Sequence, residues 1–518
     1  MADHPGDAFD DIVVGAGSSG APLAARLSED RARKVAVIEA GPDYATAAET
    51  RPDLLNGNAM SFVNHDWNHT ARLFDGRQTR FYLGKVTGGS SAVGNLVAIR
   101  GMPEDYDEWA AGGNPEWSWS RALPFLRAIE DDLDFEGEFH GRGGPVPISR
   151  WRPDELTPLQ TAYFEACLAA SYPLAEDHNH PQSTGVGPIP SNCRPDRVRV
   201  STAMSHLGPA RVRDNLTILS GSLVSRVVVD GDSVRGVELV TGANSQFLQA
   251  RRVILAAGTV GSPAILLRSG IGPAEELREL GIGVRADLPG VGKNLTDQPR
   301  SGVFMVPKPG NENLGIATGQ IVLLTAAPGS DQRNDMYYAM VNGFDLSNQL
   351  PHLRDAAGGG RVFGVMVIAR RAYSRGQVTL TSPDPRVAPR IDLNYLADER
   401  DYQILADGVR VCWELAHSPG IRSRGDRVVK VNEDTIGSPD ALRHYVRLSV
   451  DTAYNPVGTA RMGPREEHGT VVDQYCAVHG IDGLYVADAS VMPLMVRANI
   501  NLTVIMIGEM VAAMLRGT

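Results

Sequence analysis

The fold is decided by residues 9–40, which read FDDIVVGAGSSGAPLAARLSEDRARKVAVIEA. Two β-branched runs, at residues 11–14 and 35–38, predict buried parallel strands. Between them lie a glycine-rich turn at residues 15–20 and a helical pattern at residues 21–30, with apolar residues about one turn apart. This order of strand, turn, helix and strand predicts a βαβ unit that binds a dinucleotide.

Each glycine of the turn has its own physical reason. We expect Gly15 to allow the tight turn, Gly17 to let the backbone approach a pyrophosphate, and Gly20 to let the helix pack on its strand. The N-terminus of that helix supplies amide groups and a favourable dipole for the phosphates. Glu39 ends the second strand and can accept hydrogen bonds from a ribose diol. An acid at this position favours a free 2′-hydroxyl, and therefore FAD or NAD over NADP.

Length and composition set the limits around this motif. A chain of 518 residues corresponds to roughly three domains of ~150 residues, or to a large two-domain enzyme. With 42% hydrophobic and 21% charged residues, the composition excludes a mainly disordered chain and a fibre. The net charge of −11, without a basic block, argues against a nucleic-acid partner. The 55 glycines indicate many tight turns and places where backbone approaches a ligand closely.

Cysteine use and hydropathy indicate a soluble, cytoplasmic protein. The four cysteines are far apart and form no Cys-x-x-Cys pair, so we expect buried thiols in a reducing compartment: Cys167, Cys193, Cys412 and Cys476. The N-terminal residues are polar and acidic, unlike a secretory signal. We expect no membrane span, because Gly508 and Glu509 interrupt the longest apolar run, at residues 502–515, which predicts a buried helix.

Further segments typical of a dinucleotide site recur along the chain. Residues 84–95, GKVTGGSSAVGN, have almost no bulky side chains and can lie flat against a planar ligand or its phosphates. Residues 253–261 predict a buried strand followed by a turn of small residues, and residues 289–295 predict another tight turn. Residues 483–490 predict a strand that ends on the acid Asp488.

The segments between them have a different pattern. Residues 377–381 and 390–393, for example, alternate as half-exposed strands do. We therefore expect an α/β fold, α+β in overall content, in which a Rossmann-type domain is built from discontinuous segments and carries an inserted substrate domain with an antiparallel sheet. The expected boundaries are 1–150, 211–298 and 451–518 for the cofactor domain, and 151–210 and 299–450 for the substrate domain.

Taken together, the motifs resemble those of the glucose–methanol–choline (GMC) family of FAD-dependent alcohol oxidases and dehydrogenases, and the look is nearest to bacterial choline dehydrogenases and aryl-alcohol oxidases. The resemblance runs from Phe9 to Leu515. It rests on motifs that occur in order: VVGAGSSGAPLAARLSED with IEAG, GKVTGGSSAVGNLVAIRG with DYDEW, AAGTVGSPAILLRSGIGP, PGVGKNL, and YVADASVMP with NINLTVIMIGE. It implies a Rossmann-type FAD enzyme that takes a hydride from the CH–OH group of a small-molecule substrate and is reoxidised by O2 or another acceptor.

The resemblance also implies which residues contact FAD. It places the first turn on the pyrophosphate, Glu39 and Ala40 at the adenosine ribose, and the loop 86–97 along the pyrophosphate and isoalloxazine. Val224, Ala257 and Gly258 are expected near the adenine side, and Asp488 and Ala489 near the ribityl phosphate. The remaining expected contacts are Gly15, Gly17, Ser18, Ser19, Gly20, Val86, Gly89, Ser90, Gly94, Asn95, Leu96, Val97, Tyr454 and Asn501. Some relatives attach FAD through a loop histidine; Val93 stands there, so the FAD is expected to be non-covalent.

The main departure from the family pattern concerns the catalytic base. Family members generally place a histidine before the Pro-x-Gly-Thr stretch, and a second His or Asn near the C-terminus. Here these positions hold Asn455 and Asn499. A histidine with a pKa near ~6.5 can accept the hydroxyl proton at neutral pH, whereas an asparagine only donates and accepts hydrogen bonds. A positioned base typically contributes ~10²–10⁴-fold in rate.

Two smaller departures accompany it: Gly94-Asn95 stands where relatives usually have Asn-Gly, and Asp297-Gln298 where they often have Asp-His. One interpretation is an ordinary alcohol oxidoreductase that has drifted or carries an introduced Asn455, and another is an enzyme whose substrate needs less help from a base to be oxidised. The alternatives are a divergent chemistry, such as lyase-type cleavage on the same fold, and a flavin-binding protein without catalysis. The sequence does not separate an oxidase from a dehydrogenase.

The other polar clusters favour structural roles, and we expect no metal site. His178 and His180 predict a surface loop, and His65 and His69 have the spacing of one helix face without a third ligand. Residues 130–136, EDDLDFE, predict a solvated acidic loop. The segment DYDEW at residues 105–109 predicts the start of a packing helix.

Overall fold

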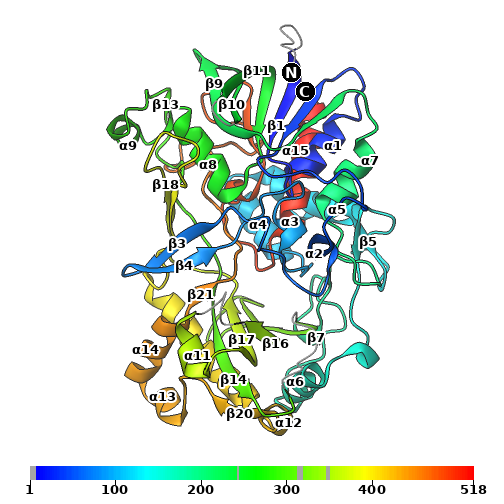
Figure 1. Ribbon diagram of the computed structural model, residues 1–518, viewed down its shortest axis with the longest axis vertical. Helices are drawn as coiled ribbons and strands as arrows, with labels where there is room; N and C mark the ends of the chain where they lie inside the picture. The colour runs from blue at the N-terminus through cyan, green and yellow to red at the C-terminus, as the bar shows by residue number, and fades with distance from the viewer. Residues whose placement is uncertain (1–7, 242–243, 312–318, 346–350, 518) are drawn as a thin grey trace.

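The computed structural model describes residues 8–241, 244–311, 319–345 and 351–517. Two large sheets lie at opposite ends of the molecule, and both chain termini lie at the end that holds the first sheet (Figure 1). This first sheet has seven strands, in the order β8 (Leu216–Leu219), β2 (Val35–Ile38), β1 (Phe9–Val14), β11 (Asn244–Leu255), β10 (Ser233–Thr241) and β9 (Leu223–Asp230), with β22 (Leu484–Val486) paired to β11.

The βαβ unit expected from residues 9–40 is confirmed. Strands β1 and β2 run parallel, with Ile12 opposite Ala36, and α1 (Gly20–Leu27) connects them. Gly15 has a backbone φ of 102°, a value that residues with a side chain rarely adopt. A Cβ on Gly20 would lie 1.9 Å from the carbonyl oxygen of Gly15, so a side chain at that position would keep the helix off the turn.

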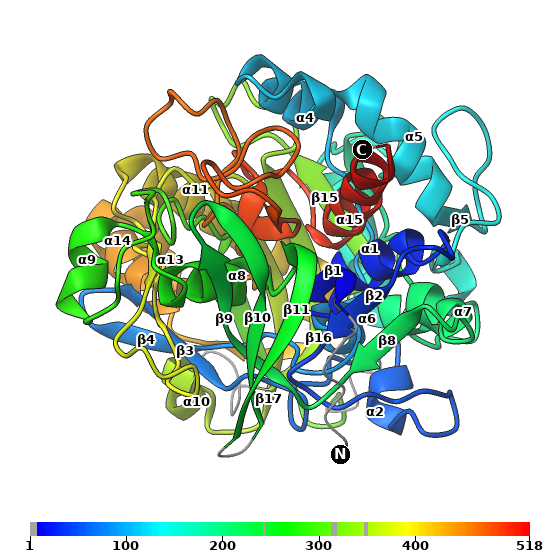
Figure 2. The ribbon, with the colours of Figure 1, turned by 90° about the horizontal axis from the view of Figure 1, so that it is seen from above.

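The last helix, α15 (Asn501–Arg516), packs beside α1, as expected for a buried helix (Figure 2). The two residues that interrupt its apolar run have local reasons. A Cβ on Gly508 would lie 2.4 Å from the carbonyl oxygen of Ser19, and the Glu509 carboxylate pairs with Arg26 Nε at 2.7 Å. Within the described residues, no helix is both long and apolar enough to cross a membrane.

The second large sheet is antiparallel, which confirms the expected substrate-side architecture. Its order is β20 (Gly425–Val428), β14 (Pro299–Pro307), β17 (Arg361–Ala369), β16 (Met336–Asp345), β15 (Ile321–Thr325) and β7 (Gly185–Pro188), with β21 (Asp451–Thr452) paired to β14. Helix α11 (Glu399–Ala416) packs on β14 and β17, and α6 (Pro158–Ala169) packs on β15 and β16. The exact domain boundaries remain a prediction.

A smaller sheet lies between the two large ones in Figure 1. It contains the two strands expected from residues 377–393, in the order β18 (Gln377–Thr379), β19 (Arg390–Asp392), β3 (His69–Phe74) and β4 (Arg77–Phe81). The remaining helices are α2 (Pro52–Leu55), α3 (Ser90–Val93), α4 (Pro103–Ala111), α5 (Trp119–Ile129), α7 (Gly208–Ala210), α8 (Gly258–Arg268), α9 (Ala274–Glu279), α10 (Pro351–Ala357), α12 (Pro419–Arg422), α13 (Glu433–Gly437) and α14 (Pro439–Ser449).

The structure corrects two expectations about histidines. His65 and His69 do not share a helix: His69 begins β3, and His65 Nε2 lies 2.9 Å from the hydroxyl of Tyr44. His178 is buried rather than on a surface loop, although His180 two residues later is exposed. The packing helix expected from residues 105–109 is confirmed as α4, and all four cysteines are buried free thiols.

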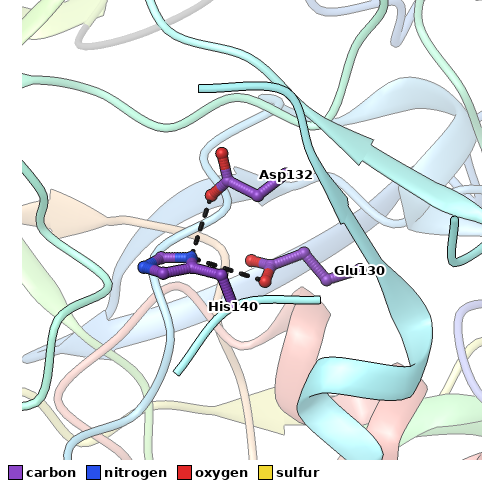
Figure 3. A group of neighbouring side chains, drawn as sticks. All are labelled: Glu130, Asp132 and His140. Atoms are coloured by element: carbon purple, nitrogen blue, oxygen red, sulfur yellow. Dashed lines mark ion pairs between the residues drawn. The ribbon is translucent and has the colours of Figure 1, made fainter. Parts of the chain in front are cut away.

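The expectation of a solvated acidic loop at residues 130–136 is wrong for its first part, because Glu130 and Asp132 are buried (Figure 3), although Asp134 and Glu136 are exposed. They flank the imidazole of His140, whose Nδ1 lies 3.1 Å from Asp132 Oδ2 and 3.6 Å from Glu130 Oε2. The other ring nitrogen lies 3.0 Å from Asp177 Oδ2. Burying carboxylates without partners is very unfavourable, so this arrangement needs cations in direct contact with them.

Two guanidinium groups provide most of that compensation. Arg150 contacts both oxygens of Asp132, at 2.8 and 3.0 Å, and Arg100 pairs with Glu130. Burial alone would lower the pKa of His140, but its hydrogen bonds to Asp132 and Asp177 outweigh that effect and raise the pKa to about 10. The imidazole is therefore a cation at neutral pH, and the cluster is an ion-pair network that holds β5 (Glu130–Asp132) in place.

We predict that His140→Ala destabilises the fold by about 3–5 kcal/mol at pH 7, because it removes one cation from a buried network whose carboxylates would keep only Arg100 and Arg150 as cationic partners. The pKa of His140 is raised in the folded state, so its contribution is complete below about pH 6.5 and is lost as the pH rises through about 10. Urea unfolding at pH 7 and pH 10 measures this difference.

His180→Ala, which changes the exposed histidine, is the matched control and should leave stability within about 0.5 kcal/mol of the original protein. A deficit for His140→Ala that is equally large at both pH values would contradict a charged imidazole.

Candidate active site

A cavity of about 510 Å³ opens where β1, β11 and β22 end. Its wall includes Val14 at the end of β1, Ala256 just after β11 and Asp488 just after β22. In α/β sheets, ligands bind outside the carboxyl ends of parallel strands, so this is the expected place for a dinucleotide. The wall continues through the small central sheet to residues 453–456, next to the second large sheet.

Almost all of the site residues expected from the sequence line this one cavity. Two do not: Gly20 packs against Gly15, and Val86 is fully buried in a small apolar cluster with Leu54 and Val93. Those that do are Gly15, Gly17, Ser18, Ser19, Glu39, Ala40, Gly89, Ser90, Gly94, Asn95, Leu96, Val97, Val224, Ala257, Gly258, Tyr454, Asn455, Asp488, Ala489, Asn499 and Asn501.

The first turn leaves space that a ligand can fill. A Cβ placed on Gly17 would meet only the Cα of Gly89, at 3.8 Å, so the fold itself does not require glycine there. Gly17, Ser18 and Ser19 line the cavity just before α1 begins, and Ser18 Oγ donates to Asn501 Oδ1 at 2.7 Å, which joins the starts of α1 and α15. A phosphate group fits this empty, amide-lined space beside a helix N-terminus.

Glu39 is held ready to accept further hydrogen bonds. Its Oε2 accepts from the amide of Ala16 at 3.1 Å, and its Oε1 accepts from the amide of Gly41 at 2.8 Å. Burial raises the pKa of Glu39 to about 7, although these amides and nearby Lys85 lower it. Each carboxylate oxygen can accept more than one hydrogen bond, so the side chain keeps capacity for a ribose diol.

Asp488 ties together the ends of two strands. Its Oδ2 accepts from the amide of Gly258 at 2.8 Å and from the hydroxyl of Ser262 at 2.5 Å, and its Oδ1 accepts from the amide of Ser490 at 2.8 Å. Burial raises the pKa of Asp488, and these donors oppose that shift. The side chain thus fastens β22 to the start of α8 at the cavity wall.

Asn455 and Asn499 both line this cavity, and their role in a reaction stays a prediction. The amide of Asn455 donates to Asp297 Oδ1 at 2.8 Å, and its side-chain Nδ2 donates to Gln298 Oε1 at 2.9 Å. The neighbouring Tyr454 has a backbone φ of 60°, a value that few residues other than glycine adopt. Burial raises the pKa of Tyr454 well above its usual value, so its phenol is neutral and a poor base at neutral pH.

The structure also brings residues to the cavity that sequence reasoning missed. Phe62 stacks on Tyr82 with ring centroids 4.3 Å apart, and Tyr82 meets Tyr454 edge-on at 5.4 Å, which gives the reaction end an aromatic wall. His69 is the single histidine among the residues that line the cavity, and burial, with a smaller effect of Lys85, lowers its pKa to about 4. No local motif marks these residues, which lie in or near β3 and β4, between the glycine turn at residues 15–20 and the loop at residues 84–95.

Comparison with known proteins places this site in a family. Models of the GMC oxidoreductase family match residues 9–300 and 372–508. An oxygen-dependent choline dehydrogenase of Escherichia coli O139:H28 is 34% identical over 535 residues, which cover 98% of this chain and 96% of the relative.

Solved structures agree in fold over nearly the whole length. A pyridoxine 4-oxidase from Mesorbium loti superposes with a TM-score of 0.89 at 30% identity, covering 98% of this chain and 99% of that one. A formate oxidase variant from Aspergillus oryzae RIB40 superposes with a TM-score of 0.88 at 25% identity, covering 99% and 98%. The chain therefore belongs to the GMC oxidoreductase family, whose members are FAD-dependent oxidoreductases.

Proposed function

We propose that the protein oxidises the CH–OH group of a small-molecule alcohol with FAD and passes the electrons to O2 or another acceptor. The observation that carries the proposal is the single cavity that joins the dinucleotide turn to Asn455 and Asn499. The relatives named as choline dehydrogenase and pyridoxine 4-oxidase support an alcohol-type donor.

The residues of the cavity wall fit FAD. The amides after Gly17 would hold the pyrophosphate, and Glu39 would accept hydrogen bonds from the adenosine ribose. Val93 is fully buried and offers no atom for attachment, which supports a non-covalent cofactor. When bound, FAD supplies an acceptor for the hydride that leaves the alcohol carbon.

The side chains at the reaction end bind and orient the hydroxyl without a strong base. Asn455 and Asn499 offer amide groups to it, and the aromatic wall of Phe62, Tyr82 and Tyr454 excludes bulk water from the carbon being oxidised. Neither amide can take the proton, and the Tyr454 phenol stays protonated. None of these three side chains therefore acts as the base that takes the hydroxyl proton.

We predict that the purified protein shows a flavin absorption band and that anaerobic addition of primary alcohols bleaches it. A panel from propan-1-ol to benzyl alcohol, followed by stopped-flow absorbance, measures the reduction. A flavin band that no alcohol bleaches would reject alcohol oxidation and favour lyase-type or non-catalytic use of the same cofactor.

We predict that Gly17→Ala lowers FAD affinity without unfolding the protein, because the added methyl meets only Gly89 in the fold but fills space needed by the pyrophosphate. Overpacking costs of about 1–3 kcal/mol correspond to a Kd that is about 5–140-fold weaker. Fluorescence titration of the apoprotein with FAD measures the Kd.

The contrasting variant is Gly20→Ala, whose Cβ would lie 1.9 Å from a backbone oxygen and should therefore reduce stability. Equal FAD affinity of Gly17→Ala and the original protein would show that the phosphates lie elsewhere.

We predict that Asn455→His raises kcat/KM for a reactive alcohol by up to about 10²-fold at pH 8, because it supplies the missing base. The pH profile of the variant should gain an ionisation near ~6.5, which the original protein lacks. Asn455→Ala, which adds no base, is the control. If turnover of Asn455→His stays flat or falls, Asn455 belongs to a dedicated chemistry and is not a decayed base.

A further inference from the structure

Two residues that depart from the family pattern are in direct contact. Asn455 stands where relatives usually have a histidine. Gln298 stands at the histidine position of the Asp-His pair that is frequent in relatives. The two residues are separated by 157 positions in the chain. In the structure Asn455 Nδ2 lies 2.9 Å from Gln298 Oε1. Both side chains are buried, Gln298 to 2% exposure and Asn455 to 8%.

The orientation of the Gln298 amide follows from its other partners. Its Nε2 donates to the carbonyl oxygens of Arg370 at 2.9 Å and Ala498 at 3.1 Å. A primary amide has two N–H donors, so both are used. The reversed orientation would place Oε1 against two carbonyl oxygens, which repel it. Gln298 therefore presents only an oxygen to Asn455.

That oxygen in turn orients Asn455. Because Gln298 Oε1 can only accept, Asn455 must offer its Nδ2, and its Oδ1 is left on the other side of the amide. Among the described residues none donates to Asn455 Oδ1, and the side chain lines the cavity. The backbone is fixed as well, since Asp297 Oδ1 accepts from the amides of both Gln298 and Asn455 at 2.8 Å.

We propose that Gln298 is a positioning residue that holds Asn455 with its carbonyl oxygen toward the substrate, so that the site selects a group that donates a hydrogen bond. This inference rests on the proposed alcohol oxidation. An acceptor facing the hydroxyl binds the neutral alcohol and disfavours its alkoxide. It offers nothing to the carbonyl oxygen of the product, which has no proton to donate, and so favours product release.

The first experiment measures this donor selectivity with the holoenzyme. The probes are the primary alcohols from propan-1-ol to benzyl alcohol and the methyl ether of each, which keeps the oxygen but lacks the hydroxyl proton. Affinities come from the saturation of anaerobic flavin reduction for the alcohols and from competition for the ethers. We expect the tightest alcohol to bind about 10-fold more strongly than its ether, the size of one hydrogen bond to a buried acceptor.

In Gln298→Leu the Asn455 amide is free to turn its nitrogen toward the cavity. The ratio of the affinity for the alcohol to the affinity for its methyl ether should therefore fall toward one. Gln298→His keeps the residue frequent in relatives and serves as a folded comparison. An unchanged ratio in Gln298→Leu, or no selectivity in the original protein, would overturn the proposal. Flavin content and thermal unfolding show whether each variant is folded.

A second variant tests the same contact without turnover. Asn455→Asp has nearly the same shape but no N–H, so its ionised carboxylate would face the oxygen of Gln298. We expect this carboxyl to have a pKa clearly above the usual ~3.9, which a pH titration of the flavin absorption band detects. A pKa at or below ~3.9 would overturn the proposal. Failure of every alcohol to reduce the flavin, with the raised pKa present, would instead reject only the proposed function.

Discussion

The convergence of β1, β11 and β22 at one edge of the first sheet is the constraint on which the rest of the structure depends. These three strands come from the start, the middle and the end of the chain, yet Ile254 lies opposite Val13 on one side and Tyr485 on the other. Parallel strands end at the same edge, so the turns that follow them must share one space. The Asp488 carboxylate, just after β22, then accepts hydrogen bonds from Gly258 and Ser262 of α8, the helix that follows β11. The wall of the dinucleotide cavity is therefore assembled from several segments of the chain, and no one segment forms it alone.

Asp297 has a similar role beside Asn455. Its two oxygens accept from the amides of Gln298 and Asn455 and from the hydroxyls of Tyr395 and Thr452. Burial raises the pKa of this carboxyl, and the four donors offset much of that effect. A buried acid that is fully hydrogen-bonded is rigid, because moving any donor leaves a desolvated oxygen. The segment before β14 and the one after β21 are thereby held in register, and this places Asn455 at the cavity.

Much of this arrangement could be predicted from the sequence, and the reasons are local. The β-branched runs around the glycine turn, the apolar run of α15 and the strand before Asp488 each carry their own pattern over a few residues. What could not be predicted depends on partners that lie outside the local pattern of residues. Glu130 and Asp132 look like solvated acids until Arg100, Arg150 and His140 surround them. The aromatic wall at Tyr82 has no motif, because it exists only once β4 lies beside Tyr454.

The contact between Gln298 and Asn455 shows why isolated departures from a family pattern are ambiguous. Viewed separately, each substitution exchanges an imidazole for an amide and suggests a lost base. Viewed together, they form a hydrogen-bonded pair in which one amide has no freedom, since Arg370 and Ala498 occupy its nitrogen. An eroded site would be expected to leave buried polar atoms unpaired, at a cost of about 1–3 kcal/mol each. Here both N–H donors of the Gln298 amide have acceptors, Asn455 donates to the Gln298 oxygen, and the Asn455 side chain, whose oxygen accepts from none of the described residues, lines the cavity. That pattern is the one expected of a binding site.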